Sequence, residues 1–365
     1  MMRFGGRSGT ELKREEGIVD LVATLKDLVE IPGPTGQEER VMRHLETLWT
    51  GKVQRLWRTP VGNLIAHVGG AGPRLLLQAH ADEIGFVVRS IDEKGFLRLA
   101  SGQRGDNPTH RYPVGQPALV LGRDVLVEGV FAVATGHVLS EAQRQKGHID
   151  YDDLFVDIGA ASRDEVVERG VHVGAAVIWN PPLRRLGSRL YGKAMDDRMP
   201  IALMTALLDA VQVADLAYDL YFAVTVQEEN GLLGASSLRT EVTPDLAIGL
   251  EVGLAGDVPT VKDETMPTAL GAGPLVIHKD SMVHYTRDLI WRVVDVAAQA
   301  SVPIQHAILE NFGSDGSELV RQGIPTALVA PPTRYTHSPF EMVDERDLDA
   351  TLRLLAAFVT TPPPA

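Results

Sequence analysis

The chain has no cysteine among its 365 residues, which excludes disulfide bonds and thiolate metal ligands. Aromatic residues make up only 5% of it, and no apolar run reaches the roughly 20 residues that a membrane-spanning helix needs. Excess positive charge is also lacking, because 35 Lys and Arg stand against 48 Asp and Glu, for a formal net charge of -13. An acidic surface repels phosphate backbones, so we expect no nucleic-acid partner. Because no apolar run is long enough to span a membrane, we expect no membrane partner either. The absence of cysteine fits a cytoplasmic location.

Length and composition predict a globular protein of two domains. A chain of 365 residues exceeds what one compact core usually holds, and a hydrophobic content of 44% supplies enough apolar material for a large core. Residues 1–17 are polar and lack the apolar middle region of a secretory signal. We expect this segment to be a flexible leader that is not part of the fold.

The order of predicted elements indicates an α/β domain that is interrupted by a β-rich insertion. Helical patterns and apolar strands occupy residues 18–83 and return from residue 187 to about residue 360. Between them, residues 84–186 show short β-rich runs separated by Gly, Pro and Asp, with almost no long helical pattern. The sequence therefore predicts a three-layer sheet with helices on both faces, and a small all-β domain inserted into it.

Expected helices lie at 18–29, 38–49, 201–213, 286–300 and 344–358. Expected strands of the α/β domain lie at 63–67, 74–78, 220–226, 246–250, 274–277, 303–308 and 326–330.

Side chains that can bind metal ions follow several of the predicted strands. His80 and Glu251 each come directly after an apolar strand, and His337 lies on a proline-bounded loop shortly after another. In open α/β sheets the ligand site lies outside the carboxyl ends of the strands, so these residues can meet there. Asp82, two residues after His80, could orient the ligands. Taken singly, each histidine is better explained as a structural residue and Glu251 as a solvated strand end.

Two pairs of adjacent acids also have alternative explanations. Asp196 and Asp197 precede a predicted helix, where a helix cap and a first-turn acid would explain them. Asp196 could instead bridge two cations, because a carboxylate has two oxygens. Glu228 and Glu229 follow a strand that looks buried, where two carboxylates are costly unless something positive compensates them. One glutamate could bind a metal while its neighbour takes a proton from water.

Together, two histidines and four carboxylates without any cysteine describe a site for divalent ions such as Zn, Co or Mn. The separate explanations would all have to hold at once, which makes the common metal site the better hypothesis.

The chain resembles the M42 family of metallo-aminopeptidases from about Leu21 to Phe358, and the order and spacing of four motifs make this resemblance specific. The motifs are H-A-D-E-I-G (80–85), G-K-A-M-D-D-R (192–198), V-Q-E-E-N-G-L-L-G-A (226–235) and R-Y-T-H-S-P (334–339). The chain departs from the family pattern at Met199-Pro200, where a glycine is usual, and at Glu251, where many members have Asp. Residues 313–316, Gly-Ser-Asp-Gly, resemble the family's G-T-D turn and are expected on the substrate side.

The resemblance implies two divalent ions per subunit, with zinc expected first and cobalt or manganese as alternatives. His80, Asp196 and Glu251 would hold one ion. Asp196, Glu229 and His337 would hold the other, so that Asp196 would bridge the two.

The resemblance also implies an aminopeptidase that acts on short peptides, with Glu228 as general base and Asp82 orienting the metal ligands. The insertion would be a PDZ-like dimerisation domain, and the subunits would assemble into dimers or dodecamers. Two alternatives stay open: a related di-metal deacylase or carboxypeptidase, and a catalytically silent relative that binds peptides as a scaffold.

Overall fold

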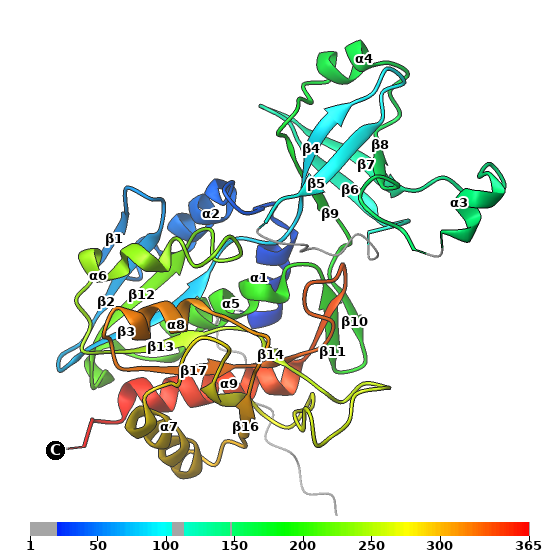
Figure 1. Ribbon diagram of the computed structural model, residues 1–365. Helices are drawn as coiled ribbons and strands as arrows, with labels where there is room; N and C mark the ends of the chain where they lie inside the picture. Colours follow the sequence, from blue (N-terminus) through cyan, green and yellow to red (C-terminus); the bar gives the residue numbers. More distant parts are fainter. Residues whose placement is uncertain (1–19, 104–112, 147, 365) are drawn as a thin grey trace, which may run out of the picture.

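The computed structural model describes residues 20–103, 113–146 and 148–364. An eight-stranded sheet with helices forms the larger part, and a six-stranded barrel projects from it (Figure 1). The leader expected at residues 1–17 lies outside the described residues. Within the described part, no helix has the length and apolar character needed to cross a membrane.

The large sheet is mixed, and its four central strands run parallel. Its strand order is β1-β2-β12-β3-β13-β17-β15-β16, with β12, β3, β13 and β17 parallel to one another. The bounds are β1 Arg55–Arg58, β2 Leu64–Gly69, β3 Arg74–His80, β12 Asp219–Thr225, β13 Leu246–Leu250, β15 Leu275–Lys279, β16 Gln305–Ile308 and β17 Thr326–Ala330. Parallel strands end at the same edge, so this sheet gathers the carboxyl ends of its four central strands in one place.

Helices cover both faces of this sheet, as the order of the predicted elements indicated. Leu75 and Leu77 pack into the core formed with α1, α2, α5, α7 and α9. Leu76 points the other way, into a smaller core with η2, α6 and α8. The bounds are α1 Leu21–Glu30, α2 Glu39–Trp49, α5 Met195–Ala210, η2 Ala235–Ser237, α6 Leu238–Glu241, α7 Arg287–Gln299, α8 Asp315–Arg321 and α9 Glu345–Thr360. The three-layer prediction is therefore confirmed.

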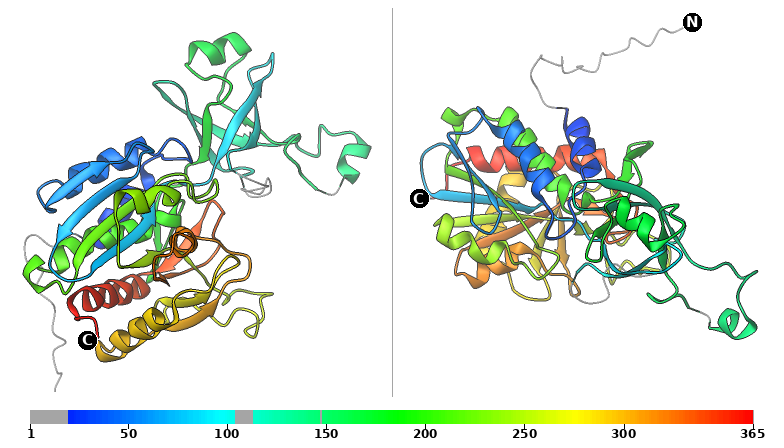
Figure 2. Two further views of the ribbon diagram at one scale, coloured as in Figure 1. Left: turned by 60° about the vertical axis from the view of Figure 1, so that its left-hand side comes forward. Right: turned by 90° about the horizontal axis from the view of Figure 1, so that it is seen from above.

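The β-rich segment forms a closed antiparallel barrel with a core of its own. Its strand order is β4-β5-β8-β7-β6-β9, and the rings of Phe86, Phe131 and Trp179 meet inside it. Its elements are β4 Phe86–Ile91, β5 Leu97–Ser101, β6 Pro117–Leu121, β7 Leu126–Ala132, α3 Glu141–Gln145, β8 Phe155–Asp157, α4 Arg163–Glu168 and β9 Ala176–Trp179. Helix α3 buries no side chain and projects away from the large sheet (Figure 2).

Short pieces that the sequence analysis missed complete the fold beside the carboxyl ends of the central strands. They are β10 Arg184–Leu186, β11 Arg189–Gly192 and β19 Glu341–Asp344 in one small sheet, and β14 Gly253–Leu254 with β18 Pro332–Thr333. The 3-10 helix η1 Val213–Asp215, which was also missed, lies at the opposite edge, before the start of β12. The missed strands β1 and β5 and helix α8 are likewise short. The pairing of β11 with β19 places Gly192 opposite Glu341, which brings two distant parts of the sequence together.

Candidate metal centre

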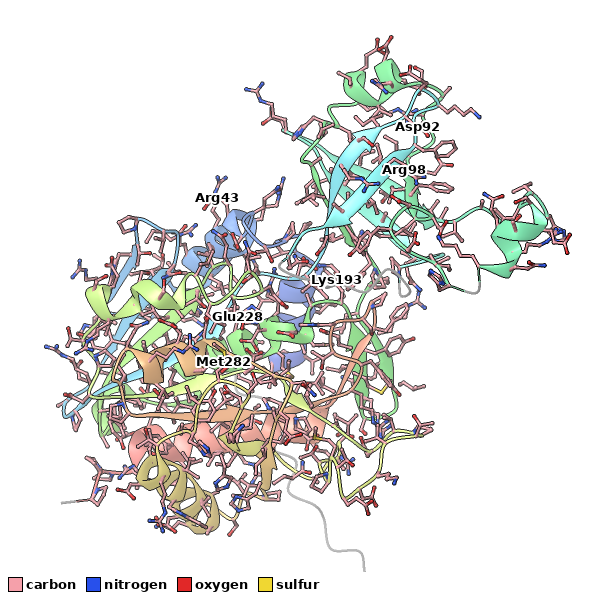
Figure 3. All side chains as sticks on the ribbon, viewed as in Figure 1. Arg43, Asp92, Arg98, Lys193, Glu228 and Met282 are labelled. Carbon is pink, nitrogen blue, oxygen red and sulfur yellow. The ribbon has the colours of Figure 1, made fainter. Side chains whose placement is uncertain are left out.

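The carboxyl ends of the central strands carry the acidic and histidine side chains that the sequence singled out. His80 is the last residue of β3, Glu251 directly follows β13, and Glu228 and Glu229 lie on the turn after β12. Figure 3 shows Glu228 at this edge, between the large sheet and the barrel. The expectation that these strand-end residues meet is confirmed.

Asp196 lies between the two histidines. Its Oδ1 is 3.0 Å from His80 Nε2, and its Oδ2 is 3.3 Å from His337 Nε2. The backbone departs from helical angles at Asp196 and Asp197, and the peptide bond between them is cis. Neither side chain caps α5, because Asp197 Oδ2 instead accepts the N–H of His80 at 3.0 Å. The cap part of the alternative interpretation is therefore wrong, although both acids do lie in the first turn of α5.

Three overlapping groups of side chains have ligand atoms that all lie within 4.8 Å of one another and could hold a metal ion. They are His80, Asp196, Asp197 and Glu251; Asp196, Glu229 and His337; and His80, Glu228 and Glu229. The structure thus brings together all five residues that were predicted as ligands, and the predicted base with them. Asp197 was not predicted as a ligand, although its motif was recognised.

Negative charge dominates this cluster. Burial raises the pKa of Glu228 well above its ordinary value, and the neighbouring carboxylates of Glu229 and Glu251 add to the shift. Burial, together with the charge of Asp196, raises the pKa of Glu251 to about 7. Burial opposes the charging of His80, yet the facing carboxylates raise its pKa well above the usual value.

A divalent cation would compensate this cluster, and the donor set fits one. His80 Nε2 faces Asp196 Oδ1 at 3.0 Å, Glu251 Oε1 at 3.8 Å and Glu228 Oε2 at 3.9 Å, and one N–H cannot satisfy three carboxylates. Asp197 Oδ1 is also buried without a hydrogen bond, and the nitrogen that faces Glu229 Oε1, His337 Nε2, also faces Asp196. Carboxylate oxygens and imidazole nitrogens are ligands that zinc and related ions prefer.

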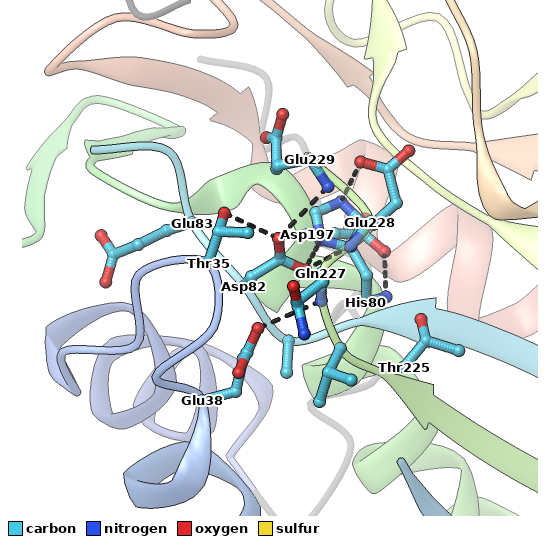
Figure 4. Close-up of polar contacts among 12 residues, drawn as sticks. Thr35, Glu38, His80, Asp82, Glu83, Asp197, Thr225, Gln227, Glu228 and Glu229 are labelled. Atoms are coloured by element: carbon cyan, nitrogen blue, oxygen red, sulfur yellow. Dashed lines mark hydrogen bonds and ion pairs between the residues drawn. The ribbon is translucent and has the colours of Figure 1, made fainter. Parts of the chain in front are cut away.

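Asp82 connects the imidazole of His80 with the loop that carries the two glutamates. Its Oδ1 lies 3.3 Å from His80 Nδ1 and accepts the N–H of Glu228 at 2.9 Å, while its Oδ2 accepts that of Glu229 at 3.2 Å (Figure 4). Burial acts to raise the pKa of Asp82, but its contact with His80 and these donors lower the pKa on balance. The geometry fits the orienting role expected of Asp82.

Glu341 is a residue of this site that the sequence analysis missed. It is 3% exposed, its Oε2 accepts the N–H of Asp196 at 3.0 Å, and its Oε1 accepts the N–H of His337 at 3.0 Å. One carboxylate therefore fixes the backbone of two ligand candidates. No local signal identified it, because its distant partner is the backbone N–H of Asp196, which the pairing of β19 with β11 brings near.

A buried ion pair joins two of the recognised motifs. Lys193 Nζ lies 2.9 and 2.8 Å from the two carboxylate oxygens of Glu83, and Glu83 also accepts the N–H of Gly33. Arg198, in turn, donates to backbone carbonyls, including that of Ala81 at 2.6 Å. These contacts fix the chain just after His80 and on both sides of Asp196.

A cleft of about 630 Å³ opens beside the cluster. Besides its acids, it is lined by Leu254, Met282, Phe312 and Gly313, and Met282 lies close to Glu228 in Figure 3. The turn at residues 313–316 was expected on the substrate side, and Gly313 does line the cleft. That expectation is wrong for Asp315, which is 1% exposed and accepts a hydrogen bond from Gln78 Nε2 at 2.7 Å. Asp315 is the first residue of α8 and points into the sheet behind the cleft.

Comparison with known proteins identifies the family. The family model for M42 glutamyl aminopeptidases matches residues 62–354. The chain belongs to this family of peptide-bond hydrolases. A lysyl aminopeptidase of Pyrococcus furiosus is 30% identical over 349 residues, which cover 92% of this chain and 95% of that protein.

Solved structures of peptidases share the fold over most of the chain. Aminopeptidase APDkam598 from Desulfurococcus kamchatkensis has a TM-score of 0.86 at 29% identity, over 93% of this chain and 94% of that one. The TET1 peptidase of Pyrococcus horikoshii, which assembles into a tetrahedron or a large octahedral shell, has a TM-score of 0.82 at 28% identity, over 93% and 99%. The M42 resemblance of the sequence motifs is confirmed.

Proposed function

We propose that this M42 enzyme removes N-terminal residues from short peptides, with two divalent ions held by the cluster. One observation carries the proposal: the two oxygens of a single carboxylate, Asp196, face two different histidines. His80 and Glu251 would complete the first set of ligands. Glu229 and His337 would complete the second, because His337 Nε2 lies 3.2 Å from Glu229 Oε1. Zinc is the first candidate, with cobalt and manganese as alternatives.

The protein's own groups supply proton transfer and orientation. When bound, the ions supply Lewis acidity and lower the pKa of the attacking water. Glu228 lines the cleft and stands 3.9 Å from His80 Nε2, so its carboxylate reaches both the cluster and the substrate space. It would take the proton of the attacking water and deliver it to the leaving amine. Asp82 would hold His80 and the backbone of Glu228 in place for this step.

The match to a family of aminopeptidases favours a substrate with a free amino terminus. The bound ions would compensate the carboxylates of the cluster, and the further acid of the cleft, Glu318, lies 4.0 Å from Arg321, so the charge of the lining does not decide between the two ends of a peptide. The proposal therefore prefers aminopeptidase activity to the carboxypeptidase alternative.

Assembly through the barrel is part of the same proposal. The barrel projects from the large sheet (Figure 2), and exposed apolar side chains lie on it at Leu126, Val130 and Val138. A second copy would cover this surface, in line with the PDZ-like dimerisation domain expected from the sequence. Mass measurement in solution would distinguish a dimer from a dodecamer, and a monomer at all concentrations would contradict this part. A cytoplasmic location also belongs to the proposal.

A substrate and chelation screen tests the function. We expect hydrolysis of aminoacyl anilides with a free amine, loss of that activity with a chelator, and recovery when Zn, Co or Mn is returned. Equal hydrolysis of N-acylated substrates would favour the deacylase alternative. Peptide binding without hydrolysis under every metal would favour the scaffold. Activity that resists complete removal of metal would contradict the metal centre.

A further inference from the structure

The loop that carries Glu228 has an unusual set of backbone hydrogen bonds. Residues 226–229 follow β12, and each of their four N–H groups donates to a side-chain oxygen. The pairs are Val226 with Asn63 Oδ1 at 3.1 Å, Gln227 with Glu38 Oε1 at 3.1 Å, Glu228 with Asp82 Oδ1 at 2.9 Å and Glu229 with Asp82 Oδ2 at 3.2 Å. The acceptors Asn63, Glu38 and Asp82 come from three distant parts of the chain and are all buried. The backbone of this loop is thus held in place by side chains from other parts of the chain.

Gln227 is the residue of this loop whose conformation most needs support. Its φ is +55°, in the left-handed region that residues other than glycine seldom adopt and that costs about 1 kcal/mol or more. Its N–H points to Glu38, which Figure 4 shows reaching across from the segment before α2. The peptide group that follows Gln227 leads directly to Glu228, so a change at Gln227 turns the side chain of Glu228.

Glu38 is itself held in a fixed position. It is 6% exposed, and the oxygen that accepts the Gln227 N–H also accepts the N–H of Gly36 at 2.7 Å. A buried carboxylate is costly, and it is stabilised here by backbone donors from two segments. An ordinary surface acid before a helix would have neither the burial nor the distant partner.

We propose that Glu38 is a positioning residue for Glu228. Its carboxylate oxygen holds Gln227 in the left-handed conformation, and this conformation directs Glu228 toward the cluster and the cleft. The catalytic consequence rests on the proposed function, whereas the effect on the loop does not. What matters is an acceptor oxygen at the end of a three-carbon side chain, and its charge is not required.

Three variants distinguish the role of the Glu38 acceptor oxygen from that of its charge and from a general loss of structure. Glu38→Gln keeps the length and an acceptor oxygen, so we expect its kcat to stay within about threefold of the parent enzyme. Glu38→Asp keeps the charge but is one carbon too short, and we expect a ten- to hundredfold lower kcat with KM within about twofold. Glu39→Gln is the control, because Glu39 is exposed on the first turn of α2 and binds only surface arginines.

Hydrogen exchange tests the same proposal without metal and without enzyme activity. Hydrogen–deuterium exchange on the metal-free protein should show faster exchange at Gln227 in Glu38→Asp, with unchanged protection in β12. Glu38→Gln and Glu39→Gln should exchange like the parent protein. Equal kcat and equal exchange in Glu38→Asp and the parent would overturn the proposal, as would an equal loss in Glu38→Gln and Glu38→Asp. If the parent shows no peptidase activity with any metal, the proposed function fails, and the exchange data alone decide the role of Glu38.

Discussion

The carboxylate of Glu341 accepts the backbone N–H of Asp196 at 3.0 Å. Its other oxygen accepts the N–H of His337, so one buried side chain sets the spacing between two ligand candidates on different loops. Groups that orient metal ligands in this way commonly change metal affinity ten- to a hundredfold when they are removed.

We expect Glu341→Ala to weaken metal binding by about ten- to a hundredfold, because the loop of His337 loses its link to Asp196. Glu341→Gln keeps one acceptor oxygen and should have an intermediate effect. Competition with a chromogenic chelator would measure both. Arg353→Gln is a suitable control, since its side chain is half exposed on α9 and contacts only Asp349. Unchanged affinity in Glu341→Ala would show that the two loops hold their positions without it.

Glu228→Gln should separate proton transfer from metal binding. The amide preserves the shape of the side chain but cannot take a proton, so we expect a hundredfold or greater loss of kcat. Metal content should stay the same, because the ligand sets proposed above do not include Glu228. Metal analysis together with single-turnover kinetics would check this. Near-normal turnover in Glu228→Gln would exclude Glu228 as the base.

The strand-end residues could be predicted because their signals are local. His80 and Glu251 each terminate an apolar run, and a run that is buried on both faces belongs to a parallel sheet whose ends form a site. Asp196 was ambiguous on local grounds, because an acid before a helix is usually a cap. Its partner His337 lies 141 positions further along the chain, and only the motif resemblance pointed to the contact.

Glu38 and Glu341 could not be predicted, for a physical reason. Each accepts one N–H from a nearby residue and one from distant backbone. A backbone N–H belongs to every residue except proline, so no residue type identifies the distant partner. Glu38 was placed at the start of a helix, which is correct, but its contact with Gln227 depends on how α2 packs beside β12. Helix α8 was missed because it has only seven residues.

The ion pair of Lys193 and Glu83 should be important for stability. Both side chains are at most 2% exposed, and removal of Lys193 leaves the buried carboxylate of Glu83 with only the more distant Arg198, 3.9 Å away, as a cationic partner. We expect Lys193→Met to lower the free energy of unfolding by about 3–5 kcal/mol. The double variant with Glu83→Gln should recover part of this loss. Urea denaturation at matched protein concentration would measure it, with Lys26→Met on the exposed face of α1 as the control. If the double variant were as unstable as the single one, the lost packing would explain the effect better than the charge.

Asp344 should make stability depend on acid pH. Hydrogen bonds from Arg346, and a further one from Ser188, lower the pKa of its carboxyl to about 2. Because the pKa is lower in the folded state, the ionised carboxylate stabilises the protein at pH values above its ordinary pKa of about 4. This contribution to the unfolding free energy disappears as the pH falls from about 4 through about 2. Asp344→Asn keeps a helix cap but loses the charge, so its deficit in unfolding free energy should be largest at pH 6 and shrink toward pH 3. Urea melts across that range would test it, and a deficit that grew toward acid pH would contradict the assignment.

Gly234 should be irreplaceable in the loop that bears Glu228. A Cβ at this position would lie 2.4 Å from the carbonyl oxygen of Val226 and 2.6 Å from Oδ1 of Asn63, and neither atom can retreat because both are buried and hydrogen-bonded. We expect Gly234→Ala to displace the loop, lower the melting temperature, and reduce kcat more than tenfold. Gly136→Ala is the matched control, since its added Cβ would meet no atom within 4 Å. Both changes add one methyl group, so a difference between the two variants reports the steric crowding at Gly234. Equal melting temperatures and activities in the two variants would contradict this prediction and show that the loop can shift to accept the added Cβ.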